Sequence, residues 1–350
     1  MKVAIVSSCL YSVPPRGKRY FGYENGFSGG YGGESQVHTL VRALCRAGVN
    51  VELFAIAGSI PPERGRIHYL PSGHWRNIWA LEPQIIDDYW NELIQCDVVH
   101  DWTLTKVIHN HAYVRLNKRC VMTPWGTGAP PPFAQYNTVC WSEFQRQLFL
   151  DQGYPETTKW IHGAVEPAMF TPSYSEGEFF LYLSRVHPTK HPEVAIKMAR
   201  ELKFDLVIAA DTESPDHIAF LQAAQKACQK DKNIRFVIDP SFEEKCNLYR
   251  NAKALILASE GECFGLVTIE AMAHGTPVIL KNDGAYPEIV KHGIHGFLCK
   301  TQDQYNNAAK NVAMIDRKEC RKLVEEKFNS DLLAHRYIEV YAQVMSGEVF

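Results

Sequence analysis

Short apolar runs alternate along the chain with longer segments in which apolar residues recur every three or four positions. The short runs predict buried strands of a parallel sheet, and the helical spacing predicts helices that cover the sheet. In the first half we expect strands at residues 2–7, 49–55, 97–102, 120–123 and 136–142. We expect helices there at residues 34–47 and 79–95.

The same alternation restarts after a polar stretch at residues 173–177, which indicates a second domain. Here we expect strands at residues 179–183, 206–211, 234–238, 254–258, 276–280 and 293–299. We expect helices at residues 192–203, 216–230, 243–252, 266–274 and 332–345. Repeated strand–helix units predict an α/β fold of two Rossmann-like, doubly wound domains.

Composition narrows the class of protein without naming a function. The length of 350 residues fits two domains, and 46% hydrophobic and 22% charged residues are ordinary for a globular protein. A formal net charge of -2 argues against a nucleic-acid partner. No apolar run approaches a membrane span, so we expect peripheral membrane contact at most. Residues 1–6 are too short for a signal peptide, and the ten scattered cysteines fit reduced thiols, so we expect a cytoplasmic protein.

Two acidic residues stand out at residues 254–280. Glu270 falls on a predicted helix where most of its neighbours at helical spacing are apolar. A buried carboxylate is costly unless hydrogen bonds satisfy it. Glu262 lies in the loop that opens this helix, where the helix N-terminus favours an anion. Together they suggest a ligand with both hydroxyl and phosphate groups, and the alternative is a buried glutamate that caps a neighbouring loop.

The motif around these residues resembles a known enzyme family. Glu262 and Glu270 stand in E-C-F-G-L-V-T-I-E-A-M-A-H-G-T-P-V-I. This is similar to the E-x7-E signature of retaining glycosyltransferases of family 4, which have the GT-B fold of two Rossmann-like domains facing across a cleft. The resemblance implies an acceptor-side domain at residues 1–172 and a nucleotide-sugar donor domain at 173–330. It also implies a C-terminal helix within 331–350 that packs back on the first domain.

The resemblance also implies a set of donor-site residues. Arg185 and Lys190 have the R-x4-K spacing of the family, and two cations beside a helix start suit a diphosphate. The alternative for them is two solvated loop cations. By carry-over, Glu262 accepts a hydrogen bond from a sugar hydroxyl and Glu270 from ribose hydroxyls. Main-chain N–H groups complete the predicted site at Gly33, Phe264, Gly265 and Leu266.

The glycine-rich turn that contains Gly33 follows the first predicted strand. It is similar to the G-G-x-E/A turn of family 4, and the alternative is a flexible surface loop. It lacks a complete G-x-G-x-x-G fingerprint, which disfavours a Rossmann oxidoreductase.

Acceptor-site candidates follow the strands at 97–102 and 120–123. His100, Asp101 and Trp102 stand where ligands bind beyond the carboxyl ends of strands in open α/β sheets. A structural role is the alternative for His100. Family members commonly have histidine where Trp102 and Trp125 stand here, which suggests an acceptor wall that is aromatic.

We therefore predict a retaining glycosyltransferase that moves a sugar from a nucleotide-diphosphate sugar to a hydroxyl of a glycan, lipid or small molecule. Arg185, Lys190 and Glu262 are the predicted catalytic residues, with the two cations stabilising the leaving diphosphate. No D-x-D motif occurs, so we expect no metal and no other cofactor. The alternatives are a sugar-nucleotide epimerase of the GT-B fold, which would act on the donor alone, and a non-catalytic glycan-binding protein. The sequence does not identify the sugar, the base, the acceptor or the oligomeric state.

Overall fold

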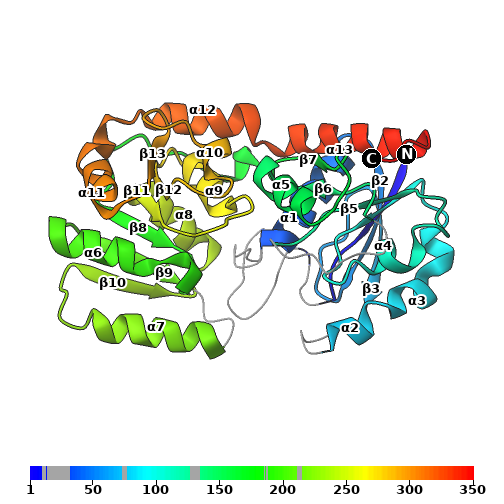
Figure 1. Cartoon of the computed structure of the whole chain (residues 1–350), viewed down its shortest axis with the longest axis horizontal. Coiled ribbons are helices and arrows are strands. Elements are labelled where there is room, and N and C mark those ends of the chain that lie inside the picture. Colours follow the sequence, from blue (N-terminus) through cyan, green and yellow to red (C-terminus); the bar gives the residue numbers. More distant parts are fainter. Residues whose placement is uncertain are drawn as a thin grey trace. The chain divides into compact units, whose positions relative to one another are not determined.

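The computed structural model describes residues 1–9, 13, 32–72, 77–126, 135–184, 186, 188–210 and 215–350 (Figure 1). These residues form two compact units. The first unit comprises the described part of residues 1–17 and 31–164 together with Asn329–Phe350. The second unit comprises the described part of Val165–Phe328. The sequence analysis expected the first domain to end at residue 172, whereas the N-terminal part of the first unit of the structure ends at Ala164.

The first unit is built on a five-stranded parallel sheet with the order β3-β2-β1-β4-β5. Its strands are β1 (Lys2–Val6), β2 (Asn50–Ile56), β3 (Gly65–Leu70), β4 (Val98–Asp101) and β5 (Cys120–Met122). A separate parallel pair consists of β6 (Val139–Cys140) and β7 (Lys159–Trp160). Residues 3–6 of β1 are fully buried, as an apolar run at the centre of a parallel sheet requires.

Helices of the first unit follow the strands along the chain. They are α1 (Gly32–Arg46), α2 (Ile78–Leu81), α3 (Gln84–Leu93), α4 (Val107–Ala112), α5 (Glu143–Asp151) and α13 (Ser330–Met345). The C-terminal helix α13 packs against α1. Arg46 at the end of α1 donates hydrogen bonds to Ser330 and to Asp331, at 2.8 Å each.

One predicted helix of the first unit is divided in two. The expected helix at residues 79–95 is broken between α2 and α3, and Pro83 occupies the N-cap position of α3. Proline lacks the N–H that would continue the α2 ladder. The preceding Glu82 is fully buried, and its carboxylate accepts hydrogen bonds from the backbone N–H groups of Leu104 and Thr105.

The second unit has a six-stranded parallel sheet with the order β10-β9-β8-β11-β12-β13. Its strands are β8 (Phe179–Leu183), β9 (Leu206–Ala210), β10 (Ile234–Ile238), β11 (Ala252–Leu257), β12 (Val278–Lys281) and β13 (Gly296–Cys299). Numbered from β8, this is the strand order 3-2-1-4-5-6 of a doubly wound Rossmann sheet. The prediction of two Rossmann-like domains in an α/β protein is therefore confirmed.

Helices cover this second sheet in two groups (Figure 1). They are α6 (Pro192–Leu202), α7 (Pro215–Ala227), α8 (Phe242–Asn251), α9 (Leu266–Ala273), α10 (Tyr286–Ile289), α11 (Gln302–Asn311) and α12 (Arg317–Lys327). Helix α6 packs against α11, whereas α9 packs against α8 and α12. Within the part of the chain that the structure describes, no helix is long and apolar enough to span a bilayer.

Candidate functional site

The second sheet has one topological switch point, between the neighbouring strands β8 and β11. Chain connections leave these two strands in opposite directions across the sheet, because β9 and β10 follow on one side and β12 and β13 on the other. Ligands of open α/β sheets bind beyond the carboxyl ends of the strands at such a point. The segment after β8 leads to Lys190, and the loop after β11 carries Glu262. The sequence candidates therefore flank the expected crevice.

Lys190 and Glu262 form an ion pair across this point. The Lys190 Nζ lies 2.6 Å from Glu262 Oε2, and the two side chains are 15% and 23% exposed. A backbone hydrogen bond of 3.2 Å from Glu260 N to Thr189 O joins the same two loops. The pair is thus held at a partly solvated edge, where an anionic ligand would meet the ammonium group and a hydroxyl the carboxylate. Arg185, the second predicted cation, lies outside the described residues.

Helix α9 begins directly after the Glu262 loop. Its N-cap is Gly265, whose φ of +89° is a left-handed conformation that favours glycine, and no side chain caps the helix. The first N–H groups of such a helix have no intrahelical partner and point toward an incoming anion. Phe264 is buried and its ring lies 5.9 Å from that of Phe328, while Leu266 is partly buried. The main-chain groups of Phe264, Gly265 and Leu266 therefore lie at the start of α9.

Glu270 lies one turn further along α9 and is only 6% exposed. The Tyr249 hydroxyl donates a hydrogen bond of 2.9 Å to Glu270 Oε2, and Lys245 Nζ lies 3.4 Å from the same oxygen. Lys245 is itself 5% exposed. Burial and the neighbouring Glu270 carboxylate raise the pKa of Tyr249 well above its usual value, so it remains a donor.

Sequence reasoning missed Lys245 and Tyr249 as partners of Glu270. The two residues are four positions apart on α8 and therefore share a helix face. Their spacing was a usable signal, but only the packing of α8 against α9 brings them to Glu270. Both side chains contact Oε2 of Glu270 rather than Oε1.

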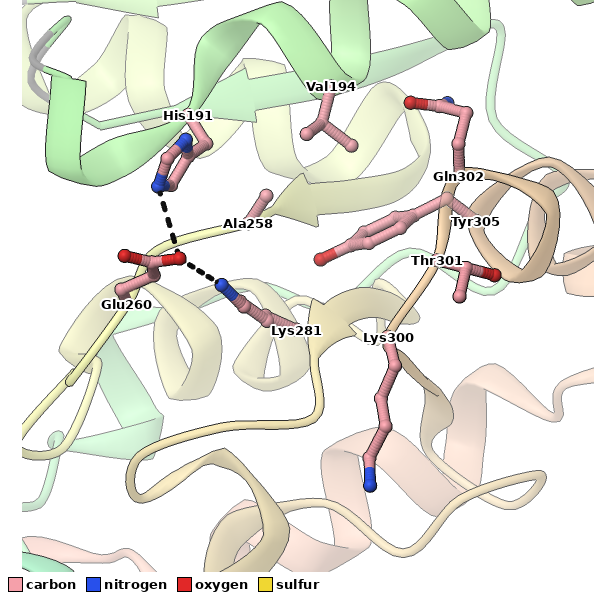
Figure 2. Close-up of a pocket in the computed structure, with 9 residues that line it drawn as sticks. All are labelled: His191, Val194, Ala258, Glu260, Lys281, Lys300, Thr301, Gln302 and Tyr305. Carbon is pink, nitrogen blue, oxygen red and sulfur yellow. Dashed lines mark hydrogen bonds and ion pairs between the residues drawn. The ribbon is translucent and has the colours of Figure 1, made fainter.

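A pocket of about 220 Å³ opens beside the two loops (Figure 2). Its lining residues are His191, Val194, Ala258, Glu260, Lys281, Lys300, Thr301, Gln302 and Tyr305. Glu260 Oε1 accepts a hydrogen bond from Lys281 and lies 3.5 Å from His191 Nε2. The Lys300 amine points away from the other lining side chains in Figure 2. His191 follows Lys190 directly and Glu260 precedes Glu262 by two positions, so the pocket shares both loops with the ion pair.

In the first unit, the structure places His100 at the end of β4 with no exposed surface. Its Nδ1 is 2.7 Å from the Tyr341 hydroxyl, and its Nε2 is 2.9 Å from Thr123 Oγ1. Burial, together with the positive charge of Lys106, lowers the pKa of His100 well below its usual value. A neutral imidazole with both nitrogens bonded matches the structural role that the sequence left open.

Asp101 and Trp102 are also buried. Asp101 Oδ1 accepts hydrogen bonds from the backbone N–H and hydroxyl of Thr103, and Oδ2 accepts from His109 N at 3.0 Å. Trp102 is 2% exposed, and its ring lies edge-on to Trp141 at 5.5 Å. Both side chains therefore contact the protein interior in this structure.

Trp125 is the one predicted acceptor residue that is partly exposed. Its Nε1 donates a hydrogen bond of 2.8 Å to Trp102 O. A Cβ at Gly33, in the first turn of α1, would lie 1.9 Å from Trp125 Cζ3, so the glycine is needed for the indole to pack there. Lys106, which sequence reasoning missed, lies 6.0 Å from the Trp125 ring, and burial lowers its pKa to about 8.

Among the residues that the structure describes, no three His, Cys, Asp or Glu side chains come together in a way that could hold a metal ion. All ten cysteines lie in the described residues and have free thiols.

Most of the second unit is similar to a known family. Residues 170–329 match the family model of glycosyl transferases group 1. The N-acetyl-alpha-D-glucosaminyl L-malate synthase of Bacillus anthracis is 28% identical over 160 residues, which cover 43% of this chain and 41% of that protein. The D-inositol 3-phosphate glycosyltransferase of Mycolicibacterium smegmatis is 28% identical over 158 residues, which cover 41% of this chain and 36% of that protein. The chain thus matches less than half the length of these curated relatives.

Solved structures of similar fold extend over the whole chain. AviGT4, a glycosyltransferase involved in avilamycin A biosynthesis, has a TM-score of 0.77 at 22% identity, with 100% of this chain and 99% of that chain covered. Anabaena HepE in complex with UDP and glucose has a TM-score of 0.72 at 15% identity, with 98% and 100% covered. At these identities the likeness shows the fold, and it confirms the predicted GT-B class.

Proposed function

Because residues 170–329 match the family model of glycosyl transferases group 1, we propose that the chain is a retaining glycosyltransferase of the family 4 type. It moves a sugar from a nucleoside-diphosphate sugar to a hydroxyl group of an acceptor. The observation that carries this proposal is the Lys190–Glu262 ion pair at the switch point, directly before the uncapped N-terminus of α9. It offers a cation and main-chain N–H groups for a diphosphate beside a carboxylate for a sugar hydroxyl.

The proposed chemistry is stabilisation of the leaving group. Negative charge develops on the diphosphate as the bond between the sugar carbon and the phosphate oxygen breaks. Lys190, with Arg185 as the second cation, offsets that charge, and the α9 N-terminus adds its dipole. Because these groups are held in place before the reaction, little reorganisation is needed when the charge appears.

Glu262 and Glu270 have different proposed tasks. Glu262, at the loop edge, accepts a hydrogen bond from a hydroxyl of the transferred sugar. Glu270 is nearly buried and keeps Oε1 for a ribose hydroxyl, while Lys245 and Tyr249 hold Oε2. A buried carboxylate whose charge is balanced by a neighbouring cation is able to accept a hydrogen bond from a neutral hydroxyl group.

The acceptor side of the proposal rests on the first unit. Since His100, Asp101 and Trp102 are buried, we propose Trp125 as the acceptor contact among the four candidates, and the acceptor itself as a hydroxyl compound of sugar type. We propose that the transfer retains the anomeric configuration, uses no metal ion and takes place in the cytoplasm.

A panel of UDP-, GDP- and ADP-sugars, each incubated with the full chain and simple sugar acceptors, tests the function. UDP-glucose is the first donor to try, because HepE binds UDP and glucose. Release of the nucleoside diphosphate with formation of a glycoside, in excess chelator, is the expected result. Conversion of the nucleotide sugar without acceptor would instead favour an epimerase, and the absence of any turnover across donors and acceptors would contradict the proposal.

A further inference from the structure

The loop that carries Glu262 contacts a turn at residues 283–286, which follows β12 and ends at Tyr286, the first residue of α10. Two hydrogen bonds join them. Asp283 Oδ2 accepts from Gly261 N at 2.8 Å, and Ala285 N donates to Glu262 O at 2.9 Å. The two hydrogen bonds hold the peptide group before Gly261 and the peptide group after Glu262. The backbone of Glu262 is therefore fixed by a segment about twenty residues away in sequence.

Close packing adds to these hydrogen bonds. Gly284 has a φ of +61°, and a Cβ built on it would lie 2.7 Å from both the N and the O atom of Glu262. A Cβ on Gly265 would lie 2.8 Å from Tyr286 Cε1. The turn thus contacts the loop at its centre and at the start of α9, with no space for a further methyl group at either point.

One residue of the loop, Gly261, has no side chain to hold this conformation. Gly261 has a φ of +59°, and a Cβ there would meet no heavy atom within 4 Å. A glycine with open space around it has many accessible conformations, and fixing them anew at each binding event is entropically costly. The contacts from the turn remove this freedom before a ligand arrives.

We propose that the 283–286 turn is a positioning element, in which Asp283 and Gly284 set the place of the Glu262 carboxylate and of the main-chain N–H groups that follow it. The catalytic consequence of this inference rests on the proposed function. Neither residue touches the ligand, and both act through the Glu262 loop. A displacement of about 1 Å at a reacting group costs on the order of 100-fold in rate, so small shifts of this loop are measurable.

A matched pair of glycine variants tests the proposal. Gly284→Ala and Gly293→Ala both place alanine at a positive φ, +61° and +78°, in the same unit. The new methyl group meets the Glu262 backbone in the first variant and open space in the second. We expect kcat/KM for the nucleotide sugar to fall about 100-fold in Gly284→Ala, mainly through kcat, with Gly293→Ala close to wild type.

Asp283 variants provide a second test should Gly284→Ala fail to fold. Asp283→Ala removes the acceptor for Gly261 N, and we expect about a tenfold loss in kcat/KM. Asp283→Asn keeps an acceptor oxygen and is expected to restore most of the activity. An Asn variant as impaired as the Ala variant would overturn the role of this hydrogen bond.

Hydrogen exchange separates this inference from the proposed function. In the wild type, the Gly261 amide is bonded to Asp283 and the Ala285 amide to Glu262, so both are protected. We expect faster exchange at residues 261–265 in Gly284→Ala and Asp283→Ala, and not in Gly293→Ala. If that contrast appears while the wild type turns over no nucleotide sugar, the proposed function fails and the positioning of the loop stands. Equal exchange in the two glycine variants, or equal turnover by them while the wild type is active, would overturn the inference.

Discussion

Replacing Glu262 with glutamine is expected to change the affinity for nucleoside diphosphate and the turnover of nucleotide sugar in opposite directions. The variant keeps the shape of the side chain and removes its charge. Lys190 Nζ now lies 2.6 Å from Glu262 Oε2, so an incoming diphosphate has to compete with that carboxylate for the ammonium group. Without the charge, Lys190 is more available to the diphosphate, but the sugar hydroxyl loses a charged acceptor.

The sizes of the two effects follow from the geometry. Coulomb attraction at 2.6 Å is about 6 kcal/mol at an effective dielectric constant of about 20. Desolvation offsets most of it, and partly exposed pairs are worth about 1 kcal/mol net. Releasing that amount tightens binding of the diphosphate about fivefold. A hydrogen bond to a charged group is worth about 1.5–3 kcal/mol, so kcat/KM for the sugar donor should fall about 10- to 150-fold.

Calorimetric titration of the nucleoside diphosphate and initial rates with the corresponding sugar donor measure the two effects. Glu260→Gln is the matched control, because Glu260 lies in the same loop but pairs with Lys281. It should leave both values near those of the wild type. Weaker diphosphate binding in Glu262→Gln, or tighter binding in the control as well, would refute the competition between Glu262 and the diphosphate for Lys190.

Three further outcomes are expected. Lys245→Met leaves the Glu270 carboxylate buried without its cation, although the Tyr249 hydroxyl still donates to it. The free energy of unfolding in urea should fall by about 3–5 kcal/mol, whereas adding Glu270→Gln should recover most of that loss. Burial lowers the pKa of His274 to about 4, against about 6.5 in the unfolded chain. Between these two pH values the unfolded state binds more protons than the folded state. The free energy of unfolding should therefore fall by up to about 3 kcal/mol as the pH drops from 6.5 to 4. His274→Gln should flatten that dependence in urea unfolding at several pH values, and an unchanged slope would contradict it. Gly33→Ala should displace the Trp125 indole and cost about 1–3 kcal/mol, with a shift in tryptophan fluorescence that is absent in Gly33→Ala/Trp125→Phe.

The second unit shows how far hydrophobic patterning reaches. The strands expected at residues 179–183 and 234–238 coincide with β8 and β10, and the helix expected at 266–274 coincides with α9 to within one residue. The two strands are short segments rich in apolar residues, and α9 has a helix-forming composition. Gly275 after α9 has a φ of +79°, as a helix-ending glycine requires. Such signals are local, so they are readable without the fold.

The sequence analysis did not predict strand β3, in which apolar and polar residues are mixed. Strand β3 (Gly65–Leu70) reads G-R-I-H-Y-L and lies at the edge of its sheet, so most of its side chains are at least partly exposed. An edge strand needs no continuous apolar run, and pairing with β2 rather than composition makes it a strand. The division of the helix expected at 79–95 had a local signal in Pro83, but the burial of Glu82 depends on residues that lie further along the chain.

Which side chains meet at the candidate site was decided by topology. Lys190 and Glu262 are 72 positions apart, and they pair because β8 and β11 are neighbours in the sheet. The resemblance named both residues, yet it did not indicate that they neutralise each other. His100 and Asp101 also lie at the end of a parallel strand, and the donor-site candidates lie in loops that follow such strands. The packing of α13 and α4 against β4 nevertheless buries both side chains.

The sequence alone determined the α/β class, most element positions and the resemblance of the second unit to a glycosyltransferase family, because these depend on local patterns and on one contiguous motif. Tertiary structure decided the environment of each charged group: Glu262 beside Lys190, Glu270 beside Lys245 and Tyr249, and the Glu262 loop against the 283–286 turn. Charge pairing and burial act through space between strands and helices that are distant in the chain. No pattern of neighbouring residues specifies such contacts until the strand order is known.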